Sequence, residues 1–550
     1  MTILSHMQIW RKTRVITRGN TWVVTTSRLL CGVASGPAKD SQVRSHGDNH
    51  TSNKCCSKKE ATLNFHDTKE TYMSKSSFEL VRSLFILKSC TYQVFVNNAE
   101  KMMRISRILL GKSLFAYLMK KSFYGQFAGG ENISELKPCV ENLAQHGVHS
   151  MLNFSVESDL DTAVGESQCE ESLKTILSIL DSSKEVCQGR PFSSFKITGL
   201  TTPQFLYEFT KLLEGVQRVF LECSVVERDI GGFVDSLSSE VVRGNETLFV
   251  NRVITREGFV KIAGSPELFD SVDTGYTGKL DFYQFREILL SNPEIISQIE
   301  GIPELTAELA KGGTRLKDRL TQIINKTKSI DARVMIDAEQ TYMQPAIDYF
   351  TVELMREHNH GVAYIYNTYQ CYLKRTPNTL TLDARDALSR GYTLGVKLVR
   401  GAYMVEEAAR AARLGYENPI QNSKEETDQT YHNMMDVLLE LVSRDHCYML
   451  AGSHNEVTVK YLMSQLQHHN LHPDARERVV FGQLYGLCDP TTFQLSSSGY
   501  TVFKAIAWGP VEEVLPFLAR RAQENTGVLG SSTRELDLLK MEIWRRVVKG

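Results

Sequence analysis

The sequence lacks the features that would assign it at once to several large classes of protein. It has no apolar run of about 18–20 uncharged residues, which a membrane-spanning helix requires. It has no GxGxxG or GxxxxGK[ST] pattern, so the usual sequence arguments for a Rossmann dinucleotide domain or a P-loop are missing. Lys and Arg total 63 against 64 for Asp and Glu, which leaves no net field to attract nucleic acid. We therefore expect no bilayer-spanning segment and no nucleic-acid partner.

Cysteine is present, but not in a pattern that binds zinc or forms a disulfide framework. The eleven cysteines are scattered, odd in number and contain no CxxC pair. This usage is typical of a reducing compartment. Apolar residues make up 42% of the 550 residues, which is enough for a sizeable core in a soluble, globular chain.

The N-terminal segment has bases but no acid. Residues 1–39 contain six Lys or Arg residues among hydroxyl and aliphatic side chains, and Asp40 is the first carboxylate. An amphipathic, acid-poor segment of this kind is typical of a mitochondrial transit peptide, so we expect matrix targeting, with an untranslocated disordered tail as the alternative. Residues 40–75, rich in polar side chains, predict a disordered linker, and residues 76–145 predict a helical N-terminal arm.

Residues 146–540 alternate short apolar, β-branched runs with helical patterns. Continuous apolar runs predict parallel strands that are buried on both faces, and eight of them predict an α/β fold of the (β/α)8 barrel type. The predicted strands are His149–Val156, Ser194–Gly199, Arg333–Glu339, Gly361–Asn367, Leu394–Gly401, Cys447–Asn455, Arg478–Leu484 and Tyr500–Trp508.

Polar side chains follow the predicted strands in succession. A barrel of this kind carries its active site at the C-terminal ends of its strands. Any one such residue is more often structural than catalytic, but seven successive strands that each supply one indicate a functional mouth. The residues are Lys196, Asp337 with Glu339, Gln370, Lys397 with Arg400, His454 with Asn455, Gln483 and Lys504.

A predicted helix after the eighth strand carries two adjacent arginines. Phe517, Arg520 and Glu524 recur at i, i+3 and i+7 and so share one face, with Arg521 one step round. Guanidinium groups bind carboxylates bidentately, so this helix predicts a clamp for a small amino or keto acid if it folds over the barrel mouth. The spacing alone also fits a solvated helix with an Arg–Glu pair.

Six short motifs extend this pattern across the barrel, from about Ser122 to Arg546, with one interruption. They are Val334–Tyr342, Asn367–Lys374, Val396–Tyr403, Ser453–Asn455, Phe481–Leu484 and Arg520–Asn525. Together these motifs resemble the proline dehydrogenase family, in its animal mitochondrial branch. The resemblance implies a flavoenzyme that binds FAD on a distorted TIM-type (β/α)8 barrel, with an N-terminal helical extension and a helical insertion between the second and third strands.

The resemblance also implies roles for the residues at matching positions. Lys196, Arg520 and Arg521 would clamp the substrate carboxylate, with Asp337 and Glu524 orienting these cations. Leu484 and Phe517 would wall the substrate ring. Lys397 would lie near flavin N5, where the hydride arrives, and its charge would stabilise the reduced flavin. The other cofactor-binding residues would be Ala338, Gln370, Val399, Gly401, Met404, Ser453, His454 and Asn455.

The implied reaction removes hydride from the ring carbon next to the nitrogen of L-proline or trans-4-hydroxy-L-proline and gives a 1-pyrroline-5-carboxylate. Electrons would pass to a membrane quinone, with a peripheral contact to the inner membrane. Two residues depart from the family pattern, since Ala505 and Phe517 each stand where tyrosine is common. Because a small residue at position 505 and the C-terminal run Glu542–Arg546 are similar to hydroxyproline dehydrogenase, we expect 4-hydroxyproline to be preferred, with a proline-selective dehydrogenase as the alternative.

Residues 205–325 predict a helical insertion with a degenerate EF-hand-like loop that starts at Asp273. Positions three and twelve of this loop are Gly275 and Gln284, so two carboxylate ligands are missing and we expect no bound metal. Two rival functions remain open. A calcium-responsive, non-enzymatic module would carry no flavin, whereas a Schiff-base lyase would use Lys196 or Lys397 as its nucleophile.

Overall fold

The computed structural model describes residues 67–153, 165–187, 189, 191–227, 251–273, 275–471, 473–524 and 533–549. The predicted transit peptide and most of the predicted linker lie outside these ranges. The linker prediction is wrong for residues 67–75, which contain helix α2 (Thr68–Thr71) and the fully buried Tyr72. Asp67 caps this helix by accepting hydrogen bonds from the backbone N–H groups of Lys69 and Glu70.

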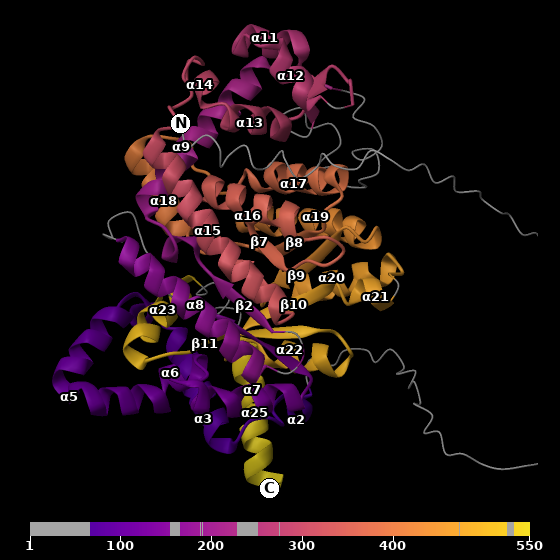
Figure 1. Cartoon of the computed structure of the whole chain (residues 1–550). Helices are drawn as coiled ribbons and strands as arrows, with labels where there is room; N and C mark the ends of the chain where they lie inside the picture. The colour runs from indigo at the N-terminus through magenta and orange to yellow at the C-terminus, as the bar shows by residue number, and fades with distance from the viewer. Residues whose placement is uncertain are drawn as a thin grey trace, which may run out of the picture. The chain divides into compact units, whose positions relative to one another are not determined.

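Eight parallel strands close into a barrel, which confirms the predicted fold class (Figure 1). All eight predicted strands are present, with bounds that differ by a few residues. Around the barrel the order is β1-β11-β10-β9-β8-β7-β6-β2. The strands are β1 (Val148–Asn153), β2 (Phe192–Phe195), β6 (Arg333–Ile336), β7 (Ile365–Gln370), β8 (Leu394–Val399), β9 (Cys447–Gly452), β10 (Val479–Leu484) and β11 (Val502–Ala507).

Alternate residues of each strand face opposite sides of the barrel wall. One set packs inside the barrel as a single cluster, which includes Met151, Phe192, Met335, Tyr366 and Phe503. The other set, such as the neighbours of Met335 at positions 334 and 336, packs outward in the large core that the helices share. This alternation decides which side chains at the strand ends reach the barrel mouth.

Helices cover the outside of the barrel (Figure 1). Several begin at a side-chain cap, such as Thr202 before α9 and Ser423 before α19, which accept backbone N–H bonds. Of the helices in the described part of the chain, none is long and apolar enough to cross a membrane. The helices around the barrel are α8 (Glu166–Val186), α9 (Pro203–Cys223), α15 (Ala307–Ser329), α16 (Gln344–His358), α17 (Thr376–Arg390), α18 (Met404–Leu414), α19 (Lys424–Ser443), α20 (Glu456–His468), α21 (Pro473–Arg476), α22 (Asp489–Ser497) and α23 (Val511–Glu524), with the 3-10 turn η2 (Ile197–Gly199) after β2.

The chain before β1 is helical, and the C-terminal helix α25 (Thr533–Lys549) packs against it. Arg546 of α25 donates to the backbone carbonyls of Tyr72 and Lys75, which ties the two ends of the described chain together. We call the helices before β1 the arm. Besides α2 they are α3 (Ser77–Cys90), α4 (Gln93–Asn97), α5 (Ala99–Lys121), α6 (Phe123–Phe127) and α7 (Ile133–Gln145).

The insertion between β2 and β6 is smaller than predicted and is not wholly helical. Its predicted ends belong to α9 and α15, which pack on the barrel helices α16 and α8. The part between them contains α11 (Arg256–Ala263), α12 (Pro266–Val272), α13 (Phe282–Ser291) and α14 (Pro293–Ile296), with a small antiparallel sheet of β3 (Val225–Val226), β4 (Arg252–Thr255) and β5 (Lys279–Leu280).

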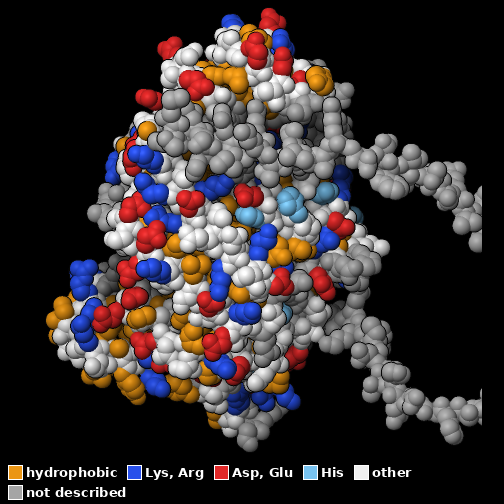
Figure 2. Space-filling model, viewed as in Figure 1, with side chains coloured by type: hydrophobic (Ala, Val, Ile, Leu, Met, Phe, Trp, Pro, Cys, Tyr) orange, Lys and Arg blue, Asp and Glu red, His pale blue; other side chains and the backbone are white. Residues whose placement is uncertain are grey.

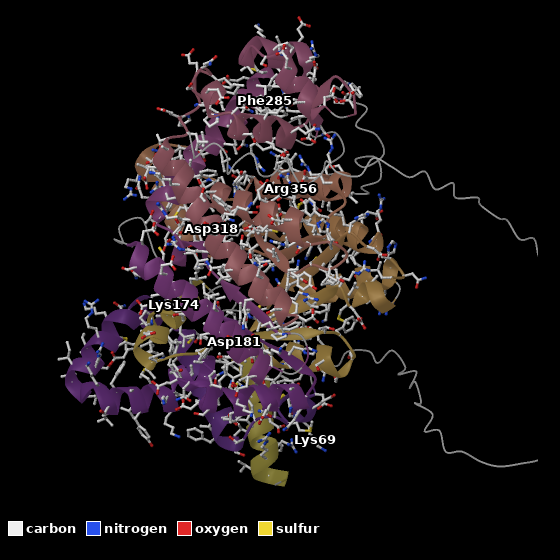
Figure 3. The ribbon with its side chains drawn as sticks, viewed as in Figure 1. Lys69, Lys174, Asp181, Phe285, Asp318 and Arg356 are labelled. Carbon is white, nitrogen blue, oxygen red and sulfur yellow. The ribbon has the colours of Figure 1, made fainter. Side chains whose placement is uncertain are left out.

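Phe285 of α13 attaches this insertion to the barrel through the main core, where its ring lies 5.6 Å from that of Phe220 on α9. A polar contact reinforces the attachment, because the hydroxyl of Tyr283 donates to the buried carboxylate of Asp383 on α17. Figure 3 labels Phe285 in the insertion and Arg356 on the neighbouring barrel helix α16. The insertion therefore packs as part of the same core as the barrel helices.

Candidate functional site

The barrel mouth collects polar side chains from strands that are far apart in the sequence. The alternation established by the interior cluster puts a defined set of strand-end residues on the inward face. These residues include two cations, one carboxylate and one amide above an apolar floor, which is a suitable lining for a small zwitterion. The inward-facing set is Lys196, Asp337, Gln370, Lys397, Leu484 and Ala505.

Lys397 and Asp337 form an ion pair across this mouth. The Nζ atom of Lys397 on β8 lies 2.6 Å from Oδ1 of Asp337, which directly follows β6, and strand β7 runs between them. Each side chain is only 16% exposed, so water screens the pair weakly. A charge-assisted bond of this length fixes the position of the ammonium group. The structure thus brings together Asp337, which was predicted to orient the substrate-binding cations, and Lys397, which was predicted to lie near the flavin.

Lys196 lies after β2 and is only 5% exposed. Its Nζ donates to the hydroxyl of Tyr403 and lies 5.2 Å from the centre of that ring. Tyr403 lies just after β8, at the start of α18, and was not among the predicted site residues. Its place in the run Val396–Tyr403, directly after a strand end, was the signal available in the sequence. A lysine and a phenol from β2 and β8 therefore meet at the mouth.

Glu339 holds the ends of β2 and β6 together rather than facing a ligand. Its buried carboxylate accepts bonds from the backbone N–H and the hydroxyl of Thr198, two residues after Lys196. Its own N–H donates to Gln344 of α16 at 2.6 Å. Ala338, predicted to contact the cofactor, lies between Asp337 and Glu339 and is buried. The strand-end carboxylate of Glu339 thus has a structural role in this arrangement.

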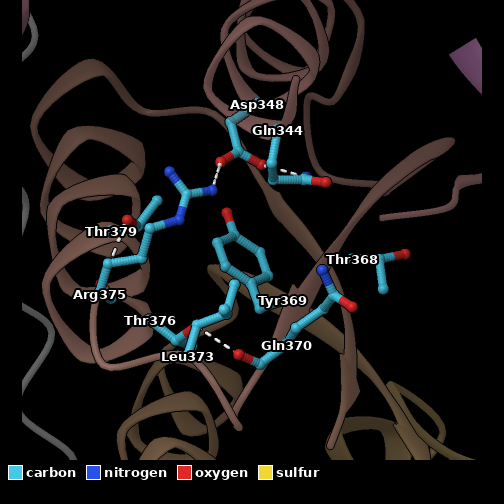
Figure 4. A pocket seen from close by; sticks show the side chains of 9 residues that line it. All are labelled: Gln344, Asp348, Thr368, Tyr369, Gln370, Leu373, Arg375, Thr376 and Thr379. Atoms are coloured by element: carbon cyan, nitrogen blue, oxygen red, sulfur yellow. Dashed lines mark hydrogen bonds and ion pairs between the residues drawn. The ribbon is translucent and has the colours of Figure 1, made fainter. Parts of the chain in front are cut away.

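Gln370 ends β7 and borders a small pocket (Figure 4). Its side-chain Nε2 donates to the backbone carbonyl of Glu339 at 3.0 Å, and the backbone carbonyl of Gln370 accepts from the hydroxyl of Thr376 on α17. Across the pocket an ion pair joins Asp348 to Arg375 at 2.8 Å. The backbone at Gln370 is therefore held to α17, and its side chain is held to the segment that follows β6.

The turn after β8 carries three residues that the sequence assigns to the cofactor. The carbonyl of Val399 accepts from the N–H of Cys371 at 2.8 Å, which holds β7 and β8 in register. Gly401 has φ +137°, and a Cβ atom there would overlap the ring of Tyr372, so only glycine fits. Met404 begins α18 and is about half exposed. This turn brings the backbone close to the mouth.

The Ser453-His454-Asn455 run follows β9 and is held by partners within the protein. Ser453 accepts from Arg400 at 3.0 Å, and Asn455 caps α20 by accepting from two backbone N–H groups. His454 keeps some exposed surface, but its Nε2 accepts from the N–H of Leu484 at 2.9 Å. Burial, with a smaller effect of the nearby cations Lys504 and Arg400, lowers the pKa of His454 to about 3. The imidazole is therefore neutral at physiological pH.

Leu484 and Ala505 lie opposite each other on β10 and β11. Ala505 packs against the interior cluster, and Leu484 packs against buried residues of the arm and of α25. Phe517 of α23 is buried in a cluster with Tyr124 of the arm and Ala507 of β11. Helix α23 includes positions 520, 521 and 524, but the side chains of Arg520, Arg521 and Glu524 lie outside the described residues. Their predicted clamp stays a prediction.

Lys504 and Gln483, two of the predicted strand-end residues, face away from the mouth. Lys504 alternates with the inward residues Phe503 and Ala505, so it faces outward and lies 3.3 Å from Asp489 of α22. Gln483 likewise faces outward, where its amide accepts from Thr492 and donates to the carbonyl of Ser453. A position at a strand end does not by itself determine which face of the barrel wall a side chain occupies, so the sequence pattern predicted both residues at the mouth.

In the EF-hand-like loop of the insertion, the carboxylate at the first loop position accepts hydrogen bonds from the backbone of the same loop. Asp273 accepts bonds from the N–H of Thr277 at 2.8 Å and from the N–H of Gly278 at 2.7 Å. Asp281 caps α13 together with Gln284, which occupies the twelfth loop position. Within the described ranges no three His, Cys, Asp or Glu side chains gather in a way that could hold a metal ion.

Comparison with known proteins gives one family and two groups of relatives. The family model described as proline dehydrogenase matches residues 136–534. The chain is 32% identical to human "Proline dehydrogenase 1, mitochondrial" over 549 residues, which covers 89% of this chain and 90% of the relative. It is 33% identical to the Xenopus laevis "Hydroxyproline dehydrogenase" over 480 residues, with 86% and 88% covered. Because the two identities are nearly equal, they do not show which group of relatives this chain resembles more.

A solved structure that matches this chain agrees with the barrel fold. The crystal structure of proline utilization A from Bdellovibrio bacteriovorus, inactivated by N-propargylglycine, aligns with a TM-score of 0.51 at 16% identity. The alignment covers 83% of this chain and 38% of that longer chain. At this identity the likeness supports the fold alone.

Proposed function

Because this chain belongs to the proline dehydrogenase family, we propose that it oxidises the ring of L-proline or trans-4-hydroxy-L-proline to the corresponding 1-pyrroline-5-carboxylate. The observation that carries this proposal is the inward-facing pair of lysines at the barrel mouth, one beside Tyr403 and one held 2.6 Å from Asp337. An amino acid substrate has a carboxylate that such cations attract and an apolar ring that Leu484 and Ala505 can wall.

Lys196 would bind the substrate carboxylate, together with Arg520 and Arg521 of α23. Its ammonium group is buried and comes from the strand end next to β6, so it reaches the mouth from the side of Asp337. The hydroxyl of Tyr403 would orient this ammonium toward the ligand. Binding through several charge-assisted bonds would fix the ring carbon next to the nitrogen in one position, which is the main requirement for hydride removal.

The ammonium group of Lys397, the amide of Gln370 and the side-chain-free backbone at Gly401 support FAD as the cofactor of this mouth. When bound, it would accept the hydride that leaves the substrate ring. Lys397 would place a positive charge beside the cofactor, and its bond to Asp337 would keep that charge in position. Gln370 would contact the cofactor ring by sharing or exchanging its present bond to the carbonyl of Glu339. The hydroxyl of Ser453 already accepts from Arg400, and the side chain of Asn455 already caps α20. Their remaining atoms or backbone groups would therefore contact the cofactor.

We further propose that 4-hydroxyproline is the preferred substrate, and Ala505 is the observation that favours it. Ala505 faces inward opposite Leu484, where a tyrosine would project its ring into the mouth. The missing ring leaves space for a hydroxyl group on the substrate. The identities of the curated relatives support either amino acid equally.

The electron acceptor would be a quinone and the location mitochondrial. A curated relative is named as mitochondrial, and residues 1–39 have the acid-poor composition of a transit peptide. A quinone dissolves in the bilayer, so the contact with the membrane would be peripheral.

The test is an absorbance scan with an activity assay of the purified chain. We expect a flavin spectrum and oxidation of at least one of the two amino acids. Lys196→Met should lower kcat/KM about ten- to hundredfold, because one charge-assisted bond to the carboxylate is worth about 1.5–3 kcal/mol. Lys261→Met, which removes an exposed lysine of α11, is the control and should have no effect. A protein that takes up no flavin after reconstitution with FAD would refute the proposal.

A further inference from the structure

The exposed large hydrophobic side chains of the described chain are concentrated in two places. Of 28 such residues, fifteen lie between positions 73 and 118 and four lie between 541 and 548. Scattered apolar residues on a surface need no explanation, but a concentration indicates an interaction surface. The longest helix of the arm, α5, carries eight of the fifteen.

Helix α5 buries one face and exposes another that is apolar. Phe115 is 3% exposed and packs with Met103 and Met119 against the cluster that includes α23. On another side Met102, Ile105 and Leu109 recur at i, i+3 and i+7 and are all exposed. Ile108 and Leu109 are each 77% exposed. The apolar face is therefore separate from the face that anchors the helix.

The same pattern continues after a break in the helix. Gly111 has φ +72°, so the backbone leaves the helical path there. Beyond it Leu114, Tyr117 and Leu118 are again exposed on one side. We call these residues, with Met102, Ile105, Ile108 and Leu109, the apolar face of α5. In Figure 2 hydrophobic and basic side chains lie side by side at the lower left, where Figure 1 places α5.

The charged residues of α5 are mostly basic. Helix α5 contains six Lys or Arg residues and a single acid, Glu100. Arg107 pairs with Glu512 of α23, and Lys120 pairs with acids that precede or begin α7. The other four bases occupy exposed positions, and they are Lys101, Arg104, Lys112 and Lys121. An exposed apolar face that is flanked by bases is typical of a helix lying on an anionic lipid surface.

We propose that the apolar face of α5 docks the protein on a membrane that contains anionic lipids. Charge complementarity selects this occupant. A second copy of the chain would place bases opposite bases in a symmetric contact, and residues 1–39 also carry bases and no acid. The inference deepens the proposed function and rests on it for its purpose, since a quinone acceptor resides in the bilayer. The helix would lie in the plane of the interface, with its lysines and arginines at the headgroups.

The experiment is co-sedimentation of the full-length, FAD-loaded protein with phosphatidylcholine vesicles, with or without about one-third phosphatidylglycerol. We expect binding to the anionic vesicles and at least tenfold weaker binding of the double variant Ile108→Glu, Leu109→Glu. The double variant Lys101→Glu, Arg104→Glu should lose the preference for anionic lipid. Leu414→Glu replaces an exposed leucine at the end of α18 and should bind as the parent does.

Two further measurements separate the possible failures. Oxidation of the amino acid with a water-soluble dye should be equal in the parent and the α5 variants, and its absence from all of them would count against the proposed function alone. The docking proposal is overturned if the parent does not sediment with anionic vesicles or if the Ile108→Glu, Leu109→Glu variant sediments equally well. It is also overturned if ultracentrifugation shows a parent dimer that this variant dissociates, since a second copy would then cover the face.

Discussion

The ion pair between Lys397 and Asp337 can be tested by removing each charge alone and both together. We expect Lys397→Met and Asp337→Asn each to lower kcat/KM, and the double variant to lose less than the two single losses combined. The reason is that each single change leaves the other group without its partner at the mouth. The two charged atoms lie 2.6 Å apart and both side chains face inward, so this ion pair is a well-defined feature of the candidate site.

The size of the effect follows from the burial of the pair. Exposed ion pairs contribute less than about 1 kcal/mol, and breaking fully buried ones costs about 3–5 kcal/mol. With both side chains 16% exposed, this pair lies between these limits. A coupling of about 2 kcal/mol corresponds to about thirtyfold in kcat/KM.

The midpoint potential of the bound flavin distinguishes an electrostatic role from a structural one. A unit charge near the cofactor contributes at least about 1 kcal/mol, or about 20 mV for a two-electron couple. Lys397→Met should therefore lower the potential by about 20 mV or more, and Asp337→Asn should raise it. The control is Lys374→Met, because Lys374 forms a similarly short but exposed pair with Glu417 at 2.7 Å. If Lys397→Met binds flavin and keeps the parent potential, Lys397 does not act on the cofactor.

Two further predictions concern Ala505 and His454. Ala505→Tyr should shift the ratio of kcat/KM values at least tenfold from 4-hydroxyproline toward proline, whereas Ala505→Ser should leave it nearly unchanged; an unaltered ratio in the tyrosine variant would disprove the pocket argument. The pKa of His454 is about 3 in the folded protein and about 6.5 in the unfolded chain. Below pH 6.5 the unfolded chain therefore binds a proton that the folded protein does not, and the folded protein loses stability as the pH falls. Between pH 7.5 and pH 5 this loss is about 2 kcal/mol, or about 2 °C in Tm for a chain of this size. In thermal melts with saturating FAD, His454→Gln should lose that much less Tm than the parent, and equal losses would show that His454 is not the group responsible.

The barrel was predictable because each of its strands is an apolar run long enough to recognise. Which strand-end residues reach the mouth was harder to predict, as Lys397 and Lys504 illustrate. Both lie in such a run, but only Lys397 alternates with outward-packed neighbours, and a shift of one residue reverses the direction of every side chain. The sequence contains no independent measure of that register. Tyr403 was missed for a related reason, since the turn that brings it to Lys196 depends on tertiary contacts.

The insertion shows the limit of motif matching. The loop at Asp273 has the glycine and the apolar residue of an EF-hand at the expected places, and Leu280 indeed pairs in a short strand with Ile254. That pairing partner comes from a segment without a recognisable motif, so the small sheet was not predicted. Asp273 closes the loop by bonding to backbone N–H groups, a role that needs no metal ion.

The packing of α5 connects the proposed docking surface with the candidate site. Phe115 on its buried face shares a cluster with Phe517 of α23 and Ala507 of β11, and Arg107 pairs with Glu512 of α23 at 2.9 Å. Helix α23 also carries the two arginines of the predicted clamp. The proposed membrane contact through the exposed face of α5 would therefore lie one helix away from the predicted clamp, without any contact between lipid and the barrel mouth. This arrangement gives a physical route by which docking could change substrate affinity, since protein cores transmit small displacements between packed helices.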